Sequence, residues 1–186
     1  SGTQAVNNVT TGANPFSVAV LRGVSEADVA AQADINVTTA NGQNVGLFAR
    51  YGAGGYYRVD AFANGANVTV QLVAYNSAAG TFTVIGSKNL ASAVGKLRVE
   101  LVGNSQKVFL DTDGPGGADP ALLFFANDSS VQAAGTVGMK AYGTGSNVDN
   151  FEALKIAAAP LSGTEDFSTS VSSQLNNTQW VETAGN

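Results

Sequence analysis

The amino-acid sequence predicts an all-β protein in which two antiparallel sheets pack face to face as a sandwich. Apolar residues recur at every second position of many segments, which is the period of a half-buried strand. Turn sequences interrupt these segments about every 8 to 12 residues, and roughly a dozen short strands fit between them. No long stretch of the 186 residues combines helix caps with a helical apolar stripe.

Four segments show the alternation most clearly, at residues 28–37, 68–75, 96–102 and 136–142. Their apolar members are Val29, Ala31, Ala33, Ile35 and Val37, then Val68, Val70, Leu72 and Ala74, then Leu97, Val99 and Leu101, and finally Val137, Met139 and Ala141. Successive side chains of a strand point to opposite faces, so each segment has one apolar face for a core. The alanines of residues 28–37 also suit a helix, and that segment is open to both interpretations.

Short turn sequences separate these runs and indicate hairpins. The pairs are Asn41-Gly42, Asn64-Gly65 and Gly103-Asn104. The central residues of a type I′ turn need positive φ, which glycine and asparagine adopt most readily. The turns therefore predict a meander of adjacent antiparallel strands.

Composition excludes several classes of function. The chain has no histidine, which excludes Ser-His and Cys-His nucleophile pairs and imidazole metal ligands. It has no cysteine, which excludes disulfides and thiolate zinc sites. A formal net charge of −5 argues against nucleic acid and against polybasic binding to a membrane. The most continuous apolar run, residues 120–126, is too short to span a bilayer.

Six segments follow one another in a recognisable order between residues 16 and 156. They are VLRGVSEADVAAQADI (20–35), GLFARY (46–51), YYRVDAF (56–62), GKLRVELVGNSQKVFLD (95–111), GTVGMKAYG (135–143) and VDNFEAL (148–154). In order and spacing they resemble the concanavalin A-like, laminin G-like family. The resemblance implies that residues 1–156 form a two-sheet antiparallel jelly-roll sandwich.

The C-terminal part of the chain departs from the family's order. Residues 157–164 are small residues with one proline and predict a linker. Residues 165–186 carry apolar residues that are uncommon in a disordered segment, namely Phe167, Val171, Leu175, Trp180 and Val181. In the resembling family a similar segment opens the domain, and reading Asn186 into Ser1 would restore that order. The segment can complete its own domain, insert into the next copy, or reflect a tandem array cut out of phase.

The function favoured by this segment is structural and extracellular. Insertion of residues 165–186 into the next copy would join subunits head to tail, through interface residues Phe167, Val171, Leu175, Trp180 and Val181, into a filament, sheath or surface array. The alternative is a carbohydrate-binding or adhesive module of a larger secreted protein, with calcium as its one conceivable cofactor. The expected partners are further copies of the chain or an extracellular glycan, and the expected location is secreted or at the cell surface.

Catalysis is not expected of this chain. Hydrolases on the resembling fold carry a Glu-x-Asp-x-Glu run that supplies paired carboxylates for acid–base chemistry. The most similar run here is Glu26 and Asp28, with Ala30 where the third carboxylate would stand.

Aspartates indicate two candidate calcium sites. Asp111, Asp113 and Asp119 lie in one glycine-rich stretch, and Ca²⁺ binds several carboxylate and carbonyl oxygens. The spacing is not that of an EF-hand, and the favoured alternative is a turn whose aspartates accept backbone N–H groups. A second site at Asp149 and Asp166 is implied by the family resemblance alone.

Aromatic residues and sequons complete the candidate sites. Rings suited to stacking on a sugar are Tyr51, Tyr56, Tyr57, Phe62 and Tyr75, although half-buried strand aromatics are the favoured explanation. Asn-x-Ser/Thr sequons, which allow glycosylation in a suitable host, occur at Asn8, Asn36, Asn67, Asn127 and Asn176.

Overall fold

The computed structural model describes residues 5–6, 16–113, 120–143 and 146–157. In these residues the chain forms strands and no helix. The strands are β1 (Ala5–Val6), β2 (Phe16–Val20), β3 (Val29–Thr38), β4 (Asn44–Gly52), β5 (Gly55–Asn64), β6 (Asn67–Asn76), β7 (Thr81–Leu90), β8 (Ser92–Val102), β9 (Ser105–Asp111), β10 (Ala121–Asn127), β11 (Thr136–Tyr142) and β12 (Asn147–Lys155). The all-β prediction is confirmed, and residues 28–37 resolve as a strand.

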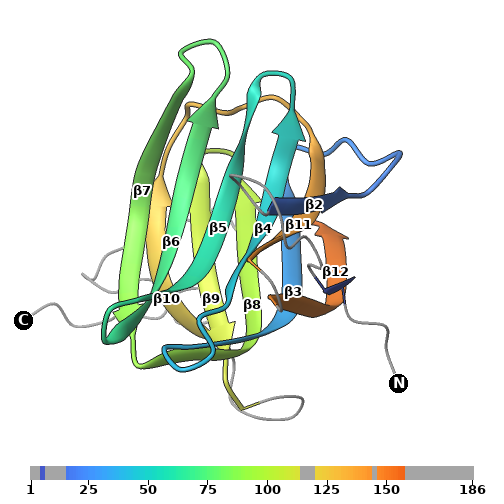
Figure 1. Ribbon diagram of the computed structural model, residues 1–186. Helices are drawn as coiled ribbons and strands as arrows, with labels where there is room; N and C mark the ends of the chain where they lie inside the picture. The colour runs from blue at the N-terminus through green and yellow to red at the C-terminus, as the bar shows by residue number, and fades with distance from the viewer. Residues whose placement is uncertain (1–4, 7–15, 114–119, 144–145, 158–186) are drawn as a thin grey trace, which may run out of the picture.

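The strands form two six-stranded sheets that face each other (Figure 1). One sheet has the order β1-β12-β3-β8-β9-β10 and the other β2-β11-β4-β5-β6-β7. Every pairing is antiparallel, and β4 to β7 form a meander. Two of the predicted turns close hairpins, since Asn64-Gly65 joins β5 to β6 and Gly103-Asn104 joins β8 to β9. The hairpin predicted at Asn41-Gly42 is wrong, because that turn joins β3 to β4 and these strands belong to different sheets. Gly65 turns β5 into β6 with a φ of 62°, in the left-handed region that glycine favours.

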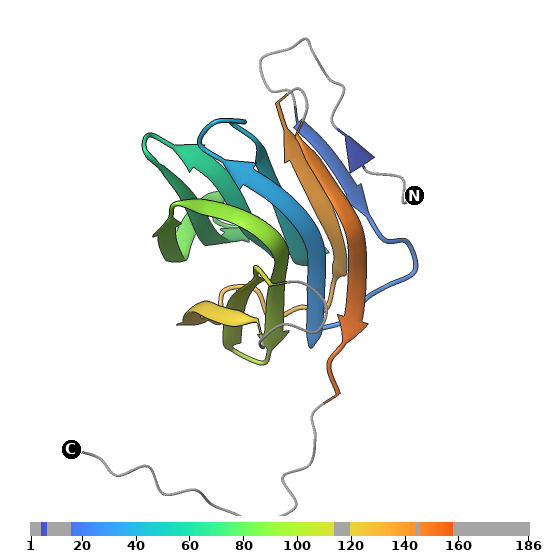
Figure 2. The same ribbon diagram turned by 90° about the horizontal axis from the view of Figure 1, so that it is seen from below.

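Alternate residues of both sheets form one hydrophobic core between them. On β3 the inward residues are Val29, Ala31, Ala33, Ile35 and Val37, and all are at most 4% exposed. β8 lies beside β3 over its full length, with Val29 opposite Leu101 and Thr38 opposite Ser92. Figure 2 shows from below that the two sheets curve around the space between them, which these inward residues of β3 help to fill.

Some predictions fall outside the described residues. Residues 158–186, which contain most of the expected linker and the whole C-terminal segment, are among these, as are residues 7–15 and 114–119. The division of the chain into domain, linker and complementing segment therefore stays a prediction. Over the described ranges, no helix is long and apolar enough to cross a membrane.

Candidate functional site

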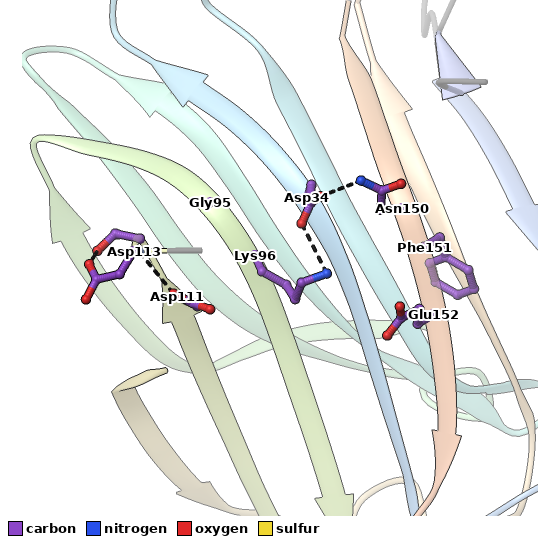
Figure 3. A pocket seen from close by; sticks show the side chains of 9 residues that line it. Asp34, Gly95, Lys96, Asp111, Asp113, Asn150, Phe151 and Glu152 are labelled. Atoms are coloured by element: carbon purple, nitrogen blue, oxygen red, sulfur yellow. Dashed lines mark hydrogen bonds and ion pairs between the residues drawn. The ribbon is translucent and has the colours of Figure 1, made fainter. Parts of the chain in front are cut away.

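A polar hollow of about 690 Å³ opens on the outer face of the β1–β10 sheet (Figure 3). Four strands contribute to it, namely β12, β3, β8 and the end of β9. The residues that line it are Asp34, Gly95, Lys96, Asp111, Thr112, Asp113, Asn150, Phe151 and Glu152. A cavity of this size is in the range of small-ligand sites, which are about 300–1,000 Å³.

Strand register explains why these side chains meet. Asp34 on β3 pairs with Lys96 on β8, and Lys96 pairs in turn with Asp111 on β9. Ala33 and Ile35 point into the core, so Asp34 between them points outward. The three residues thus form one row across three strands on the outer face.

A β-bulge in β12 adds an amide to the row. The pairing with β3 shifts between Asp149 and Glu152, and Asn150 inside the bulge has a φ of 49°. Asparagine tolerates this left-handed conformation better than most residues, and bulges commonly redirect side chains. Nδ2 of Asn150 donates to Oδ2 of Asp34 at 2.6 Å.

Asp34 is therefore held from two sides. Its Oδ1 lies 3.2 Å from Nζ of Lys96, and its Oδ2 accepts from Asn150, as the dashed lines of Figure 3 mark. Glu152 is fixed in a similar way, since its Oε2 accepts from Nε2 of Gln32 at 2.5 Å. The ammonium of Lys96 has three N–H donors and each carboxylate has several lone pairs, so the fixed groups can also bind a ligand.

Gly95 shapes the floor of the hollow. Its φ is 129°, and a Cβ at this position would lie 1.9 Å from the carbonyl oxygen of Asp111. Only glycine lets β8 approach the end of β9 this closely. The hollow therefore depends on one residue without a side chain.

The structure places Asp111 and Asp113, two of the three aspartates of the first candidate calcium site, at the rim of this hollow. Oδ1 of Asp111 accepts the backbone N–H of Asp113 at 3.0 Å, which is the turn geometry that the sequence favoured. Asp149 accepts the backbone N–H of Asn150 at 2.8 Å. Asp119 and Asp166 lie outside the described residues. Within the described part of the chain, no three His, Cys, Asp or Glu residues are placed to hold a metal ion.

Three of the predicted aromatic residues, Tyr51, Tyr56 and Tyr75, lie on the opposite sheet and form a row of rings that Phe82 extends. Ring centroids are 5.3 Å apart for Tyr51 and Tyr56, 5.0 Å for Tyr56 and Tyr75, and 4.5 Å for Tyr75 and Phe82. The interplanar angles of these pairs are 23°, 33° and 31°. The first pair is stacked and the other two are tilted, so Tyr56 has a ring on each side and is half-buried. Free ring surface remains at the ends, where Tyr51 is 36% and Phe82 61% exposed.

Charged residues beside this stack bind one another. Asp60 lies 2.8 Å from Nη2 of Arg58 through Oδ2 and 2.8 Å from Nζ of Lys140 through Oδ1. Burial lowers the pKa of Lys140 below its ordinary value, and the nearby charge of Asp60 opposes this effect. The outer face of the β2–β7 sheet therefore has a closed network of charges at its centre.

Comparisons with known proteins agree with this architecture. The sequence matches no family model and no curated protein. The structure is similar to carbohydrate-binding module CBM66 from Bacillus subtilis, with a TM-score of 0.59 and 20% identity over 82% of this chain and 91% of that one. It is also similar to the GH43 protein BlXynB from Bacillus licheniformis, with a TM-score of 0.53 and 16% identity over 70% of this chain and 28% of that one. The protein has a jelly-roll sandwich fold.

Tyr57 is separated from the other tyrosines of the jelly roll. Its ring points into the core and is fully buried, and its hydroxyl donates to Oδ1 of Asp128 at 2.6 Å. Burial, with the hydrogen bond to Asp128, raises the pKa of Tyr57 to about 12. Burial alone would raise the pKa of Asp128, but hydrogen bonds from Ser130 and Tyr57 outweigh it and lower that pKa. Tyr57 is thus a core residue that anchors the loop after β10.

This environment predicts a loss of stability at alkaline pH. The folded-state pKa lies above the unfolded value of 10.0, so the contribution of Tyr57 is fully present below pH 10 and is lost as the pH rises toward 12. A shift of this size corresponds to about 3 kcal/mol. Urea unfolding between pH 9.5 and 11.5 should show that Tyr57→Phe loses less stability than the wild type. Exposed Tyr142→Phe is the control and should follow the wild type; parallel curves for all three would contradict the prediction.

The remaining predicted residues are the sequon asparagines, Phe62 and the expected subunit-interface residues. Asn36, Asn67 and Asn127 are exposed, while Asn8 and Asn176 lie outside the described residues. Phe62 is half-buried on β5. The expected subunit-interface residues, Phe167 to Val181, also lie outside the described part of the chain.

Sequence reasoning missed most of the hollow. Asp34 and Lys96 are visible as outward residues of alternating segments, but nothing local indicates that their strands pair. Asn150 and Glu152 are brought into place by a bulge, which leaves no clear pattern in the sequence.

Proposed function

We propose that this protein is a non-catalytic carbohydrate-binding module that binds sugar hydroxyls in the polar hollow on the outer face of the β1–β10 sheet. The observation that carries the proposal is the convergence of Asp34, Lys96, Asn150 and Glu152 on one cavity of about 690 Å³. The likeness of the fold to a carbohydrate-binding module supports the ligand class.

The donor and acceptor pattern suits a polyhydroxylated ligand. A sugar hydroxyl donates one hydrogen bond and accepts others, so it pairs well with carboxylates on one side and with amide or ammonium groups on the other. Hydrogen bonds to charged groups are the stronger kind, which offsets the cost of removing water from the hydroxyls. Asp34 is positioned in advance by Lys96 and Asn150, and less entropy is lost when the ligand binds.

The role proposed for these residues is binding. The module would act outside the cell on a glycan. Head-to-tail assembly through residues 165–186 remains a separate prediction of the sequence.

A glycan array followed by calorimetry tests the proposal. We expect Lys96→Met to weaken binding of the best array ligand at least tenfold, about 1.4 kcal/mol, because the ammonium donates directly to the ligand and fixes Asp34. Lys107→Met is the matched control, since Lys107 is an exposed lysine on neighbouring β9 that does not line the hollow. Its affinity should equal that of the wild type.

Two outcomes would overturn the proposed site. One is equal affinity of the Lys96 and Lys107 variants. The other is a glycan that the Phe82→Ala variant no longer binds and the Lys96→Met variant binds as tightly as the wild type. Phe82 lies at the exposed end of the aromatic stack, so that result would place the binding site on the other sheet. A protein that retains no glycan at all would overturn the function itself.

A further inference from the structure

The two lateral sides of the sandwich differ in how they are closed. Figure 1 shows β7 and β10 at one side and β2 with β12 at the other. On the β7 side, the ring of Phe124 from β10 covers Gly86, where an added Cβ would lie 2.7 Å from the ring. The ring of Phe124 therefore packs against the backbone of β7 across the gap between the sheets, and this side is sealed.

On the opposite side, among the described residues, the edge of β12 is open beyond Val148. β1 pairs with β12 only through Asn147 and Val148. Across the described ranges, no strand pairs with the outer edge of β12 beyond Val148, while its inner edge pairs with β3 up to Lys155. An open strand edge offers a row of backbone N–H and C=O groups to another strand.

An apolar groove of about 210 Å³ lies beside this open edge. It is lined by Leu21, Val24, Glu26, Val29, Ala153, Leu154 and Lys155. Leu21 is 40% and Leu154 43% exposed, although both belong to a groove that leads toward the core. The two charged residues bind each other, with Oε2 of Glu26 2.9 Å from Nζ of Lys155, which leaves an apolar floor. An open edge beside an apolar groove is the arrangement that accepts an added strand.

We propose that this edge and groove are occupied by residues 165–186 of the same chain. β12 ends at Lys155, which itself lines the groove, so the chain continues from the site that it would fill. The eight residues 157–164 span at most about 28 Å when extended, which is ample for a return along β12. The segment carries apolar side chains that would fill the groove, namely Phe167, Val171, Leu175, Trp180 and Val181.

The tethered segment has an advantage over the same segment of another copy. A short linker gives an effective concentration on the order of millimolar, which exceeds the usual concentration of a second molecule. Binding within one chain therefore precedes head-to-tail exchange. It also buries the apolar residues of the segment and covers Leu21 and Leu154 at the same time.

The single tryptophan of the chain, Trp180, reports on the docking in the full-length protein. We expect it to emit at the short wavelength of a buried indole and to resist quenching by acrylamide. Leu154→Asp should shift the emission to longer wavelength and raise the quenching constant severalfold, and Leu21→Asp should do the same. Leu122→Asp on β10 is the matched control, because Leu122 is 49% exposed at the sealed side, and it should leave Trp180 unchanged.

Three results would overturn the inference. The first is a wild-type Trp180 that is as accessible to acrylamide as free tryptophan. The second is an identical emission in the two groove variants, the Leu122 variant and the wild type, with all four equally folded by circular dichroism. The third is protection of Trp180 from acrylamide that disappears on dilution while light scattering reports a falling mass. That result would mean that residues 165–186 of a second copy occupy the groove.

Discussion

Replacing Arg50 with methionine is expected to lower the free energy of unfolding by about 3–5 kcal/mol, because three backbone carbonyls lose a hydrogen bond from a charged donor, each worth about 1.5–3 kcal/mol at most. The residue is 1% exposed, and its guanidinium connects three loops. Nε donates to the carbonyl of Ala27 at 2.6 Å, Nη1 to that of Val131 at 2.8 Å and Nη2 to that of Gly103 at 2.8 Å. Methionine has a similar volume and no donors, so all three acceptors would lose their partner.

Urea unfolding at pH 7 measures the effect, and an unchanged m-value assigns it to stability. Arg98→Met is the matched control, since Arg98 binds Glu100 and Gln32 on the outer face of a sheet and its side chain is 22% exposed. That substitution should cost less than about 1 kcal/mol. Arg50→Lys should behave almost like Arg50→Met, because one ammonium cannot reproduce the planar fork of donors. A cost for Arg50→Met no larger than for Arg98→Met would contradict the role assigned to Arg50.

Arg50 also shows where strand periodicity stops being informative. Val45, Leu47 and Ala49 point into the core, and the alternation predicts the same for Tyr51. The pairing of β4 with β5 shifts between Ala49 and Gly52, and Arg50 adopts a φ of 52°. The irregularity turns Arg50 inward and sends Tyr51 to the outer face. A single bulge thus converts a charged residue into a core residue.

The fold could be predicted because its determinants are local. Alternation in residues 68–75 and a turn at Gly65 are both read from neighbouring positions, and β5 and β6 pair as they indicate. The polar hollow is different, because Asp34, Lys96 and Asn150 are far apart in the sequence. Their meeting depends on the pairing of β3 with β8 and β12, and opposite charges on strands that are not neighbours in sequence do not reveal which strands will pair.

Replacing Gly95 with alanine is expected to cost about 3 kcal/mol of stability or more and to weaken glycan binding over tenfold. An alanine with a φ of 129° is strained, and its Cβ would meet the carbonyl oxygen of Asp111 at 1.9 Å. The obstacle is backbone, so a rotamer change cannot relieve it. β8 and β9 must separate at their ends, and that motion moves Lys96 away from Asp111.

Gly65→Ala distinguishes this effect from ordinary loss of glycine freedom. Gly65 also has a positive φ, 62°, but a Cβ there would meet no atom within 4 Å. The Gly65→Ala substitution should lower the free energy of unfolding by only about 1–2 kcal/mol. It should leave glycan affinity unchanged, because the turn lies outside the hollow. Urea unfolding and calorimetry on the two variants separate the outcomes. If Gly95→Ala is destabilised no more than Gly65→Ala and still binds the glycan, then the close approach of β8 to β9 does not shape the binding site.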